Sequence, residues 1–215
     1  MDAIPTGSGP GRMTIAVIPV RGLDGAKSRL GAVLDAEERR DLAERLARRT
    51  IRAAVATPAI AETLVVTPDD DVRRLALELG ARPLLQRSGG LNQALRQARA
   101  EAIGAGADAL LVLPTDLPRI TSDAISALLD TLRDPARPLV AIVPDRHGRG
   151  TNALLLAPPD AIEFCFGGDS RAAHVEAAMA IDAQLVEADG PLTIDLDTPD
   201  DLLLAEHGDP ELARG

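Results

Sequence analysis

Short apolar runs without charged residues alternate along this sequence with longer segments rich in helix-forming residues. Uninterrupted runs of valine, isoleucine and leucine are typical of strands that are buried on both faces. Strands that alternate with helices predict an α/β fold with a mostly parallel sheet covered on both sides. We expect strands at residues 15–20, 64–67, 83–86, 109–113, 139–143, 153–157 and 184–187, and a last extended piece within 193–197.

The segments between the apolar runs carry signals for the start and the end of helices. Asp35 and Glu38 have the spacing of a capping box at the start of a helix that extends to residue 57. Gly80 stands where a C-terminal cap is expected, after a helix that begins in the aspartates 69–71. Further helices are expected at 91–103, at 121–132, in the segment that ends at 180, and from 198 onward. In sheets of this kind ligands bind at the carboxyl ends of the strands.

The composition excludes several classes of partner. The chain has 33 acidic and 23 basic residues, and its formal net charge of −10 at pH 7 repels nucleic acids and anionic membrane surfaces. There is no Trp or Tyr to stack on bases, so the core must be aliphatic. Cys165 is the only cysteine, which excludes an intrachain disulfide framework and cysteine-rich zinc sites and fits a reducing cytoplasm. We expect a cytoplasmic protein without nucleic-acid or membrane partners.

One domain accounts for most of the chain. With 215 residues, of which 46% are hydrophobic, the chain is long enough for one sizeable core. Residues 1–13 lack the basic and apolar regions of a signal peptide, so we expect a disordered leader, with Met13 as an alternative start of translation. The domain is expected at 14–208 and a C-terminal tail at 209–215.

The segment AVIPVRGLDGAKSRL (residues 16–30) contains the first candidate site. A buried strand leads there into a turn with glycines, two arginines and a lysine. Glycines let backbone N–H groups approach an oxyanion, and the cationic side chains pair with phosphate oxygens. A phosphate-rich ligand is one interpretation of this opening turn, and a basic surface turn after a strand is the other.

Carboxylates follow the strands at two further places. Asp116 comes directly after the buried strand at 109–113, where it is well placed to hold a hard cation such as Mg²⁺ through oxygen ligands. Asp195 or Asp197, in the sequence IDLDTP, could supply a second carboxylate. The alternative for this region is a helix N-terminus, which favours acidic residues and a proline in its first turn; that interpretation suits Asp200 and Asp201 best.

Two more turns are rich in hydrogen-bond donors. One contains Gly148, Gly150, Thr151 and Asn152, and the other contains Gly167, Gly168 and Ser170 at the start of a helix, where anions bind readily. The first turn also fits a solvent-exposed hairpin. His174 is expected on a helix face rather than as a catalyst, and no GxSxG motif of an acyl-transfer enzyme is present. Taken together, the three turns and the carboxylates indicate a nucleotide plus a second anion.

Six segments occur in the order found in one enzyme family. IPVRGLDGAKSRL, GLNQAL, LPTDLP, PDRHGRGTNALL, FGGDSRAAH and DLDTPDDL resemble the phosphoenolpyruvate or 2-phospho-L-lactate guanylyltransferases (CofC/FbiD type) of deazaflavin coenzyme F420 biosynthesis. The resemblance covers nearly all of residues 14–206. It implies a three-layer, nucleotide-diphospho-sugar-transferase-like (Rossmann-like) domain whose central, mostly parallel sheet has seven or eight strands, and it implies a nucleotidyltransferase that uses Mg²⁺.

The resemblance also implies roles for individual residues. Lys27, Arg29 and Asp116 would be catalytic, and Asp116 would bind the metal together with Asp195 or Asp197. The nucleotide would contact Pro19, Val20, Arg21, Gly22, Lys27, Ser28, Arg29, Pro114 and Thr115, with Gly90 and Asn92 near its guanine and ribose. The acceptor would contact Thr151, Asn152, Gly167 and Ser170. Two positions depart from the family pattern: Arg21 replaces a common Lys, and LPTDLP replaces ADLP or GDLP.

The implied reaction joins GMP from GTP to the phosphate of phosphoenolpyruvate or 2-phospho-L-lactate and releases pyrophosphate. Because a phosphomonoester is mostly dianionic at neutral pH, it needs no general base. The product would pass to the next enzyme of deazaflavin coenzyme assembly, and the family suggests a homodimer. The acceptor stays open between the two compounds. Another nucleotidyltransferase, of the sugar-phosphate or molybdopterin type, and a non-catalytic nucleotide-binding protein are the alternatives.

Overall fold

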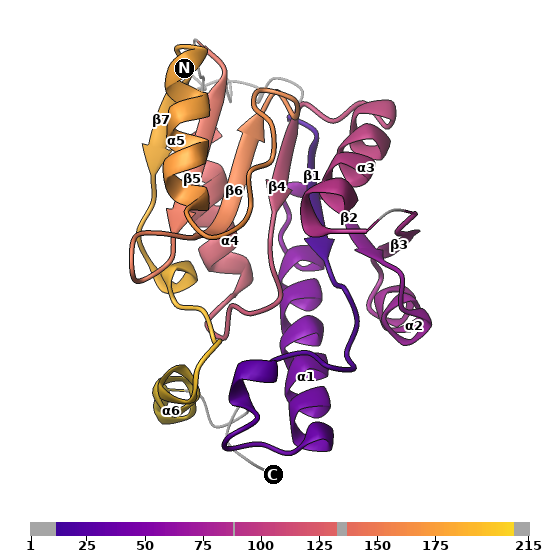
Figure 1. Cartoon of the computed structure of the whole chain (residues 1–215). Helices are drawn as coiled ribbons and strands as arrows, with labels where there is room; N and C mark the ends of the chain where they lie inside the picture. The colour runs from indigo at the N-terminus through magenta and orange to yellow at the C-terminus, as the bar shows by residue number, and fades with distance from the viewer. Residues whose placement is uncertain (1–11, 88, 133–136, 209–215) are drawn as a thin grey trace, which may run out of the picture.

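The computed structural model describes residues 12–87, 89–132 and 137–208, with side chains to residue 205. Seven strands form one sheet in the order β3-β2-β1-β4-β6-β5-β7 (Figure 1). Strand β6 is antiparallel to its neighbours β4 and β5, and the other paired strands are parallel. The strands are β1 Thr14–Pro19, β2 Ile60–Thr67, β3 Arg82–Leu85, β4 Ala109–Val112, β5 Leu139–Pro144, β6 Thr151–Ala157 and β7 Gln184–Glu187.

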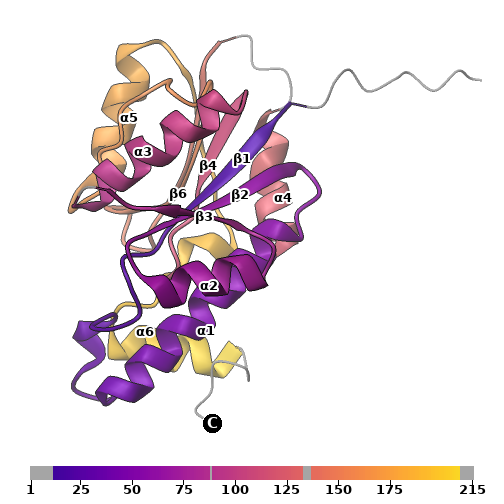
Figure 2. The same ribbon diagram turned by 90° about the vertical axis from the view of Figure 1, so that its right-hand side faces the viewer.

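Helices cover both faces of this sheet. Figure 2 shows α3 and α5 on one side and α1, α2 and α4 on the other. The two faces bury separate aliphatic cores, as the uncharged strands predict. The α-helices are α1 Ala36–Val55, α2 Asp70–Glu78, α3 Leu91–Gly104, α4 Ser122–Leu129, α5 Ser170–Ala180 and α6 Pro199–Gly208. Short 3₁₀ helices are η1 Ser28–Leu30, η2 Asp130–Leu132 and η3 Pro191–Thr193.

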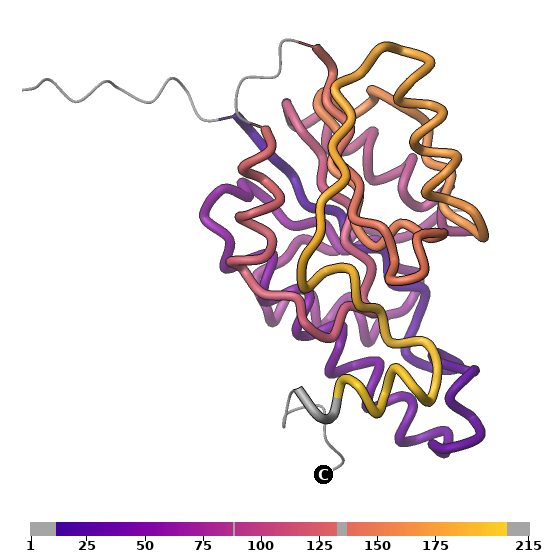
Figure 3. The backbone as a smooth tube through the Cα atoms, turned by 90° about the vertical axis from the view of Figure 1, so that its left-hand side faces the viewer, coloured from indigo at the N-terminus to yellow at the C-terminus, as the bar shows by residue number. Residues whose placement is uncertain are grey.

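A third, smaller apolar cluster lies beyond the edge of the sheet. It joins α6 to the start of α1 and to η1, and Figure 3 shows α6 beside the segment that contains η1. Its members are Leu30, Leu34, Leu42, Leu46, Leu196, Leu202 and Ala205. This cluster brings the C-terminal helix to the segment 30–46, at the edge where β1 and β4 end.

Most of the predicted elements are confirmed. Asp35 caps α1, and Glu38 completes the capping box by accepting a hydrogen bond from the Asp35 N–H. Gly80, with φ of +82°, follows α2 in the left-handed conformation that a C-terminal cap requires. Strand β2 begins at Ile60, earlier than predicted. Residues 1–11 of the expected leader (1–13) and the whole expected tail (209–215) lie outside the described residues.

The last extended piece expected within 193–197 does not form a strand of the sheet, although Ile194 is in the extended conformation. Residues 191–193 form η3, and residues 194–197 have no regular structure. Pro191 has no N–H for a sheet ladder, and the N–H of Leu196 donates to the carbonyl of Asp116 at 2.8 Å instead of to a strand. The segment therefore bends across the edge of the sheet.

No helix in the described part of the chain is both long and apolar enough to cross a membrane.

Candidate active site

The opening turn leaves the sheet at the carboxyl end of β1. The N–H of Val20 still donates to Val66 of the neighbouring strand, at 3.0 Å, and the chain then turns away. Gly22 has φ of +158°, and a Cβ there would lie 3.0 Å from the carboxylate of Asp69, which also accepts a hydrogen bond from the Leu23 N–H. Asp69, the N-cap of α2, thus fixes the start of the turn from outside it.

Lys27 adopts the left-handed conformation, with φ of 51° and ψ of 38°, just before η1. A residue other than glycine is strained in this region, and the conformation persists only where surrounding contacts hold it in place. The surroundings of Lys27 are two carboxylates. Its Nζ atom lies 3.2 Å from Asp197 Oδ1 and 3.8 Å from Asp116 Oδ2, and only 11% of the side chain is exposed. The conformation thus directs a largely buried ammonium group at the carboxylates.

A cavity of about 670 Å³ lies inside the opening turn. Most of the residues predicted to bind the nucleotide line it, and so does Asp197 from the far end of the chain. These lining residues are Pro19, Val20, Arg21, Gly22, Lys27, Ser28, Arg29 and Thr115. Pro114 is not among the residues that line it.

A second cavity, of about 620 Å³, lies on the other side of the same strand end. Pro19, Val20 and Arg21 line both cavities, and Gly89, Gly90 and Leu91 at the start of α3 line only the second. A ligand that extends from one cavity to the other therefore passes Arg21. The second cavity is the more apolar of the two, with Leu91 and Ala94 in its wall, as the planar face of a base requires.

The carboxylates of the site come from loops far apart in sequence. Asp116 follows β4, and Asp195 and Asp197 precede α6; the backbone bond from Leu196 to Asp116 holds the two loops together. Burial raises the pKa of the Asp195 carboxyl, and the nearby negative charge of Asp116 raises it further. One carboxylate oxygen of Asp195 is buried and has no hydrogen-bond partner. Asp195 therefore holds an uncompensated acceptor next to a second carboxylate.

A cation fits this donor set. Magnesium is commonly held by one or two carboxylates together with substrate phosphates, and Asp116 and Asp195 provide the two carboxylates. Across the described residues, no three or more acidic, histidine or cysteine side chains gather as a complete metal site. Asp197, the other candidate ligand, is paired with Lys27 and, at 3.5 Å, with Arg29.

Asp201 anchors the loop that carries Asp195 and Asp197. This buried carboxylate, in the first turn of α6 as the helix-N-terminus interpretation predicts, accepts hydrogen bonds from the backbone N–H groups of Asp197 and Thr198 just before the helix, at 3.0 and 2.7 Å, as in a capping box. Arg146, in the hairpin between β5 and β6, forms an ion pair with the other oxygen of Asp201. The hairpin and the acidic loop are thus held together by a pair with a buried carboxylate.

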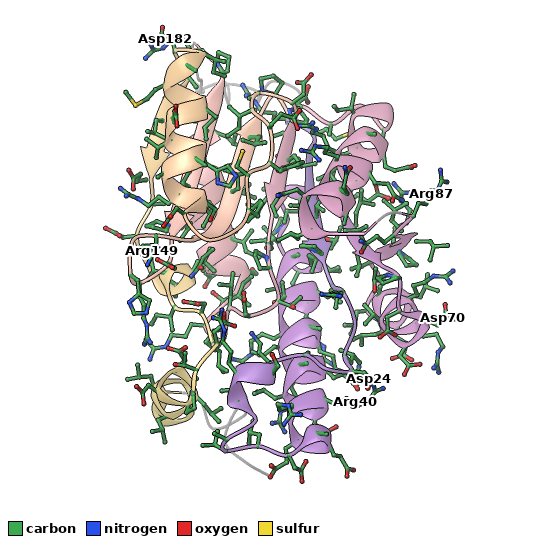
Figure 4. All side chains as sticks on the ribbon, viewed as in Figure 1. Asp24, Arg40, Asp70, Arg87, Arg149 and Asp182 are labelled. Carbon is green, nitrogen blue, oxygen red and sulfur yellow. The ribbon has the colours of Figure 1, made fainter. Side chains whose placement is uncertain are left out.

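The predicted acceptor residues stand on the adjacent part of the same edge. Because β6 is antiparallel to β4, the first residues of β6, Thr151 and Asn152, lie at the edge where β4 ends. Both are buried, and the Asn152 side chain donates to the carbonyl of Leu192 at 3.0 Å. Arg149, labelled in Figure 4, lies in the hairpin before β6. It pairs with Asp169 at 2.9 Å, which fastens the hairpin to the start of α5.

Ser170, at the start of α5, and Gly167, just before the helix, are the other predicted acceptor residues. Ser170 is the first residue of α5 and is buried, and its N–H donates to the Gly167 carbonyl at 3.3 Å. One turn further along, His174 Nδ1 lies 3.0 Å from Thr151 Oγ1. The start of α5 and the start of β6 therefore form one structural unit.

Comparison with known proteins identifies the family. The chain matches the family described as "Guanylyl transferase CofC like" over residues 14–214. This chain belongs to that family. It is 46% identical over 191 residues to phosphoenolpyruvate guanylyltransferase of Sphaerobacter thermophilus, which covers 88% of this chain and 90% of the relative. The corresponding protein of Rubrobacter xylanophilus is 43% identical over 192 residues, 89% of this chain and 92% of the relative.

Solved structures support the fold. A protein of Desulfovibrio desulfuricans G20 assigned as a nucleotide-diphospho-sugar transferase superposes with a TM-score of 0.69 at 17% identity, over 87% of this chain and 83% of that one. The 4-diphosphocytidyl-2C-methyl-D-erythritol synthase of Anaerococcus prevotii gives 0.60 at 11% identity, over 92% and 96% of the two chains. The CofC-like chain therefore has the nucleotidyltransferase fold, and it is an enzyme of the nucleotidyltransferase class.

Asn92 lies in the first turn of α3, and its side chain is bonded within the protein. It is not among the residues that line the two cavities beside β1. Its side-chain amide is paired twice with the backbone of Phe166: Nδ2 donates to the carbonyl and Oδ1 accepts from the N–H, both at 3.0 Å. Asn92 thus ties α3, whose N-terminus borders the second cavity, to the segment 164–168 before Ser170. In this CofC-like enzyme Asn92 thus links the predicted nucleotide side of the sheet edge to the predicted acceptor side.

Sequence reasoning missed the residues that hold the site from behind. Asp69, Arg146 and His174 each act through a contact between segments far apart in the chain. Only Asp69 carried a usable signal, since it begins an acidic run directly after a strand. His174 was expected only on a helix face, and the partners of Arg146 and His174 follow from how β6 and α5 are placed in the fold.

Proposed function

We propose that this chain is a phosphoenolpyruvate guanylyltransferase that joins GMP from GTP to the phosphate of its acceptor and releases pyrophosphate. The observation that carries the proposal is the position of Lys27, whose ammonium group lies between Asp116 and Asp197 beside the opening-turn cavity. It places positive charge next to carboxylates suited to Mg²⁺, as a triphosphate site needs. The names of the relatives support guanylyl transfer and phosphoenolpyruvate.

The reaction needs charge neutralisation more than proton transfer. A phosphate oxygen of the acceptor attacks the α-phosphorus of GTP in line, a new P–O bond forms, and the bond between the α-phosphorus and the bridging oxygen breaks. The electron pair leaves with pyrophosphate toward Lys27 and Arg29. Because the attacking phosphate is already mostly dianionic at neutral pH, no catalytic base is required. The two anions repel each other, so the site must hold them in line.

Each half of the edge supplies a part of this task. The turn from Arg21 to Arg29 would hold the triphosphate, and the second cavity, bordered by Gly90, would take the guanine. Thr151, Gly167 and Ser170 would receive the carboxylate and phosphate of the acceptor with neutral donors. Asp116 and Asp195, with Asp197 once it parts from Lys27, would hold Mg²⁺. When bound, the metal would neutralise phosphate charge and orient the triphosphate.

The acceptor is the finer part of the proposal. Phosphoenolpyruvate and 2-phospho-L-lactate carry the same charged groups and differ in planarity, so both suit a site of this donor chemistry. We take phosphoenolpyruvate as the substrate on the names of the relatives. The product, enolpyruvyl-2-diphospho-5'-guanosine, would then enter deazaflavin coenzyme F420 biosynthesis.

A matrix of substrates tests the proposal. Pyrophosphate release is measured with GTP, CTP, ATP and UTP, each against phosphoenolpyruvate, 2-phospho-L-lactate and a sugar phosphate, and the product is weighed by mass spectrometry. We expect turnover with GTP and phosphoenolpyruvate and the mass of the guanosine diphosphate product. Turnover with a sugar phosphate alone would overturn the proposal in favour of another nucleotidyltransferase, and tight GTP binding without turnover would indicate a non-catalytic protein.

A further inference from the structure

His174 is a buried imidazole that the proposed reaction does not use. It lies on α5, one turn after Ser170, with no exposed surface, and the ring of Phe166 meets it edge-on at 5.0 Å between ring centres. Burial lowers the pKa of His174 to about 4, so the ring is neutral at physiological pH. A neutral imidazole has one N–H donor and one lone-pair acceptor, and the surroundings decide which nitrogen is which.

The backbone fixes the tautomer. His174 Nε2 lies 3.0 Å from the backbone nitrogen of Cys165, and a backbone N–H can only donate. Nε2 must therefore be the acceptor, and the ring proton is on Nδ1. Nδ1 lies 3.0 Å from Thr151 Oγ1, so His174 donates to the Thr151 hydroxyl.

The direction of the hydrogen bond between His174 and Thr151 determines whether the Thr151 hydroxyl can donate to a ligand. Because its oxygen accepts from His174, the Thr151 hydroxyl keeps its own proton for another partner. With the opposite tautomer the hydroxyl would donate to the ring and would turn its lone pairs to the outside. A carboxylate or phosphate only accepts hydrogen bonds, so it is attracted by the first arrangement and repelled by the second.

We propose that His174 is the positioning residue that makes Thr151 a hydrogen-bond donor to the anionic acceptor, while its other nitrogen holds the segment 164–168 in place. The inference rests on the proposed function, in which Thr151 meets the carboxylate or phosphate of the acceptor. The same ring thus joins two parts of the acceptor half: β6 through Thr151 and the segment before Ser170 through Cys165.

The tautomer can be read directly in the unmodified protein. The chain has three histidines, so ¹⁵N NMR of the imidazole rings is readily assigned, with the variant His174→Gln identifying the signal of residue 174. We expect a protonated Nδ1 and an unprotonated Nε2 for His174 at neutral pH. An N–H on Nε2 would overturn the proposal.

Two substitutions separate the functions of the two nitrogens. The terminal oxygen of Gln reaches about the place of Nε2, whereas the amide nitrogen of Asn reaches about the place of Nδ1. His174→Gln therefore keeps an acceptor for the Cys165 N–H and loses the donor to Thr151, and His174→Asn does the reverse. We expect His174→Gln to raise KM for phosphoenolpyruvate about tenfold, with KM for GTP little changed. His174→Asn should raise KM for phosphoenolpyruvate less than His174→Gln does, and it should lower the melting temperature more.

A double-mutant cycle with Thr151→Val tests whether His174 acts through Thr151. Thr151→Val removes the hydroxyl at nearly constant shape and should raise KM for phosphoenolpyruvate about tenfold. Adding His174→Gln should then change that KM by less than about twofold. Independent, multiplied effects would show that His174 only packs the core, and a parallel rise in KM for GTP would do so too. Wild-type enzyme that does not use phosphoenolpyruvate would refute the proposed function, and the NMR result would still decide the tautomer.

Discussion

The two halves of the active edge are built by opposite means. Around the opening turn, charged groups that are partly exposed pair with one another, as Lys27 and Arg29 do with Asp197. On the acceptor side, buried neutral groups bond to backbone and to each other, as Thr151, Asn152 and His174 do. Ion pairs near water are weak and exchange partners readily, whereas buried hydrogen bonds hold one geometry.

This difference indicates how each half receives its anion. The cationic side chains of the opening turn are paired with carboxylates until phosphates and a metal ion replace those partners. The acceptor half needs no exchange, because its donors are already oriented. We therefore expect substitutions in the first half to change the use of GTP and the dependence on metal, and substitutions in the second half to change the affinity for the acceptor.

Asp116→Asn is expected to have the largest effect. Partners that only touch a metal ligand are worth about 10-fold to 100-fold in activity or metal affinity, so loss of a ligand carboxylate should lower kcat/KM by about a hundredfold or more. The melting temperature should stay within a few degrees, because about a third of this side chain is exposed. The control is Asp160→Asn, an exposed carboxylate beyond the opposite end of β6. A normal rate for Asp116→Asn would remove this residue from the site.

Lys27→Ala should separate the two halves. The substitution removes a cation expected to bind the triphosphate, so KM for GTP should rise about tenfold to a hundredfold, with KM for phosphoenolpyruvate changed much less. Arg29→Ala is the matched comparison, and its effect should be smaller, because 75% of the Arg29 side chain is exposed. An equal rise in both KM values for Lys27→Ala would mean that the halves are not independent.

Asp195→Asn should stabilise the fold while it impairs the enzyme. The raised pKa of Asp195 means that folding favours the protonated form, so its ionisation lowers stability as pH rises through the folded pKa. At neutral pH without metal, the variant should melt a few degrees above the wild type. The gain should shrink as the pH is lowered below that pKa, where both side chains are neutral.

Asp197→Asn supplies the opposite control for this experiment. Asp197 is paired with two cations, so its neutralisation removes attraction and should leave the melting temperature unchanged or slightly lower. Thermal melts in a chelator across the acidic to neutral range measure both variants. A lower melting temperature for Asp195→Asn at neutral pH would contradict the role given to the unpartnered carboxylate.

The fold was largely predictable because strand burial leaves a local trace in sequence. All seven strands were expected from apolar runs such as ALLVL at 109–113. The meeting of Lys27 with Asp116 was also expected, since both follow strands that end at one edge. The strand expected within 193–197 is absent from the sheet, because the Leu196 N–H donates to the carbonyl of Asp116 in another loop. No local sequence pattern indicates that contact.

The contacts behind the site could not be predicted in the same way. Asn92 pairs with Phe166 and His174 pairs with Thr151 across 74 and 23 positions of sequence. Such pairs depend on how α3 and α5 lie against the sheet, which is set by packing of the whole face. A residue type and a nearby glycine indicate only that a polar group is present, and its partner and direction come from the assembled fold.

The small apolar cluster that holds α6 contributes to the active site more than to the folding of the sheet. Leu202 and Ala205 of α6 pack on α1 and η1 and so keep Asp195 and Asp197 beside the opening turn. The two larger cores on the faces of the sheet include none of the described side chains of α6, residues 199–205. A chain cut before Pro199 would keep both of those cores, and its acidic loop would lose its anchor. Proteolysis or a frameshift near the C-terminus would therefore yield a folded protein with an incomplete active site.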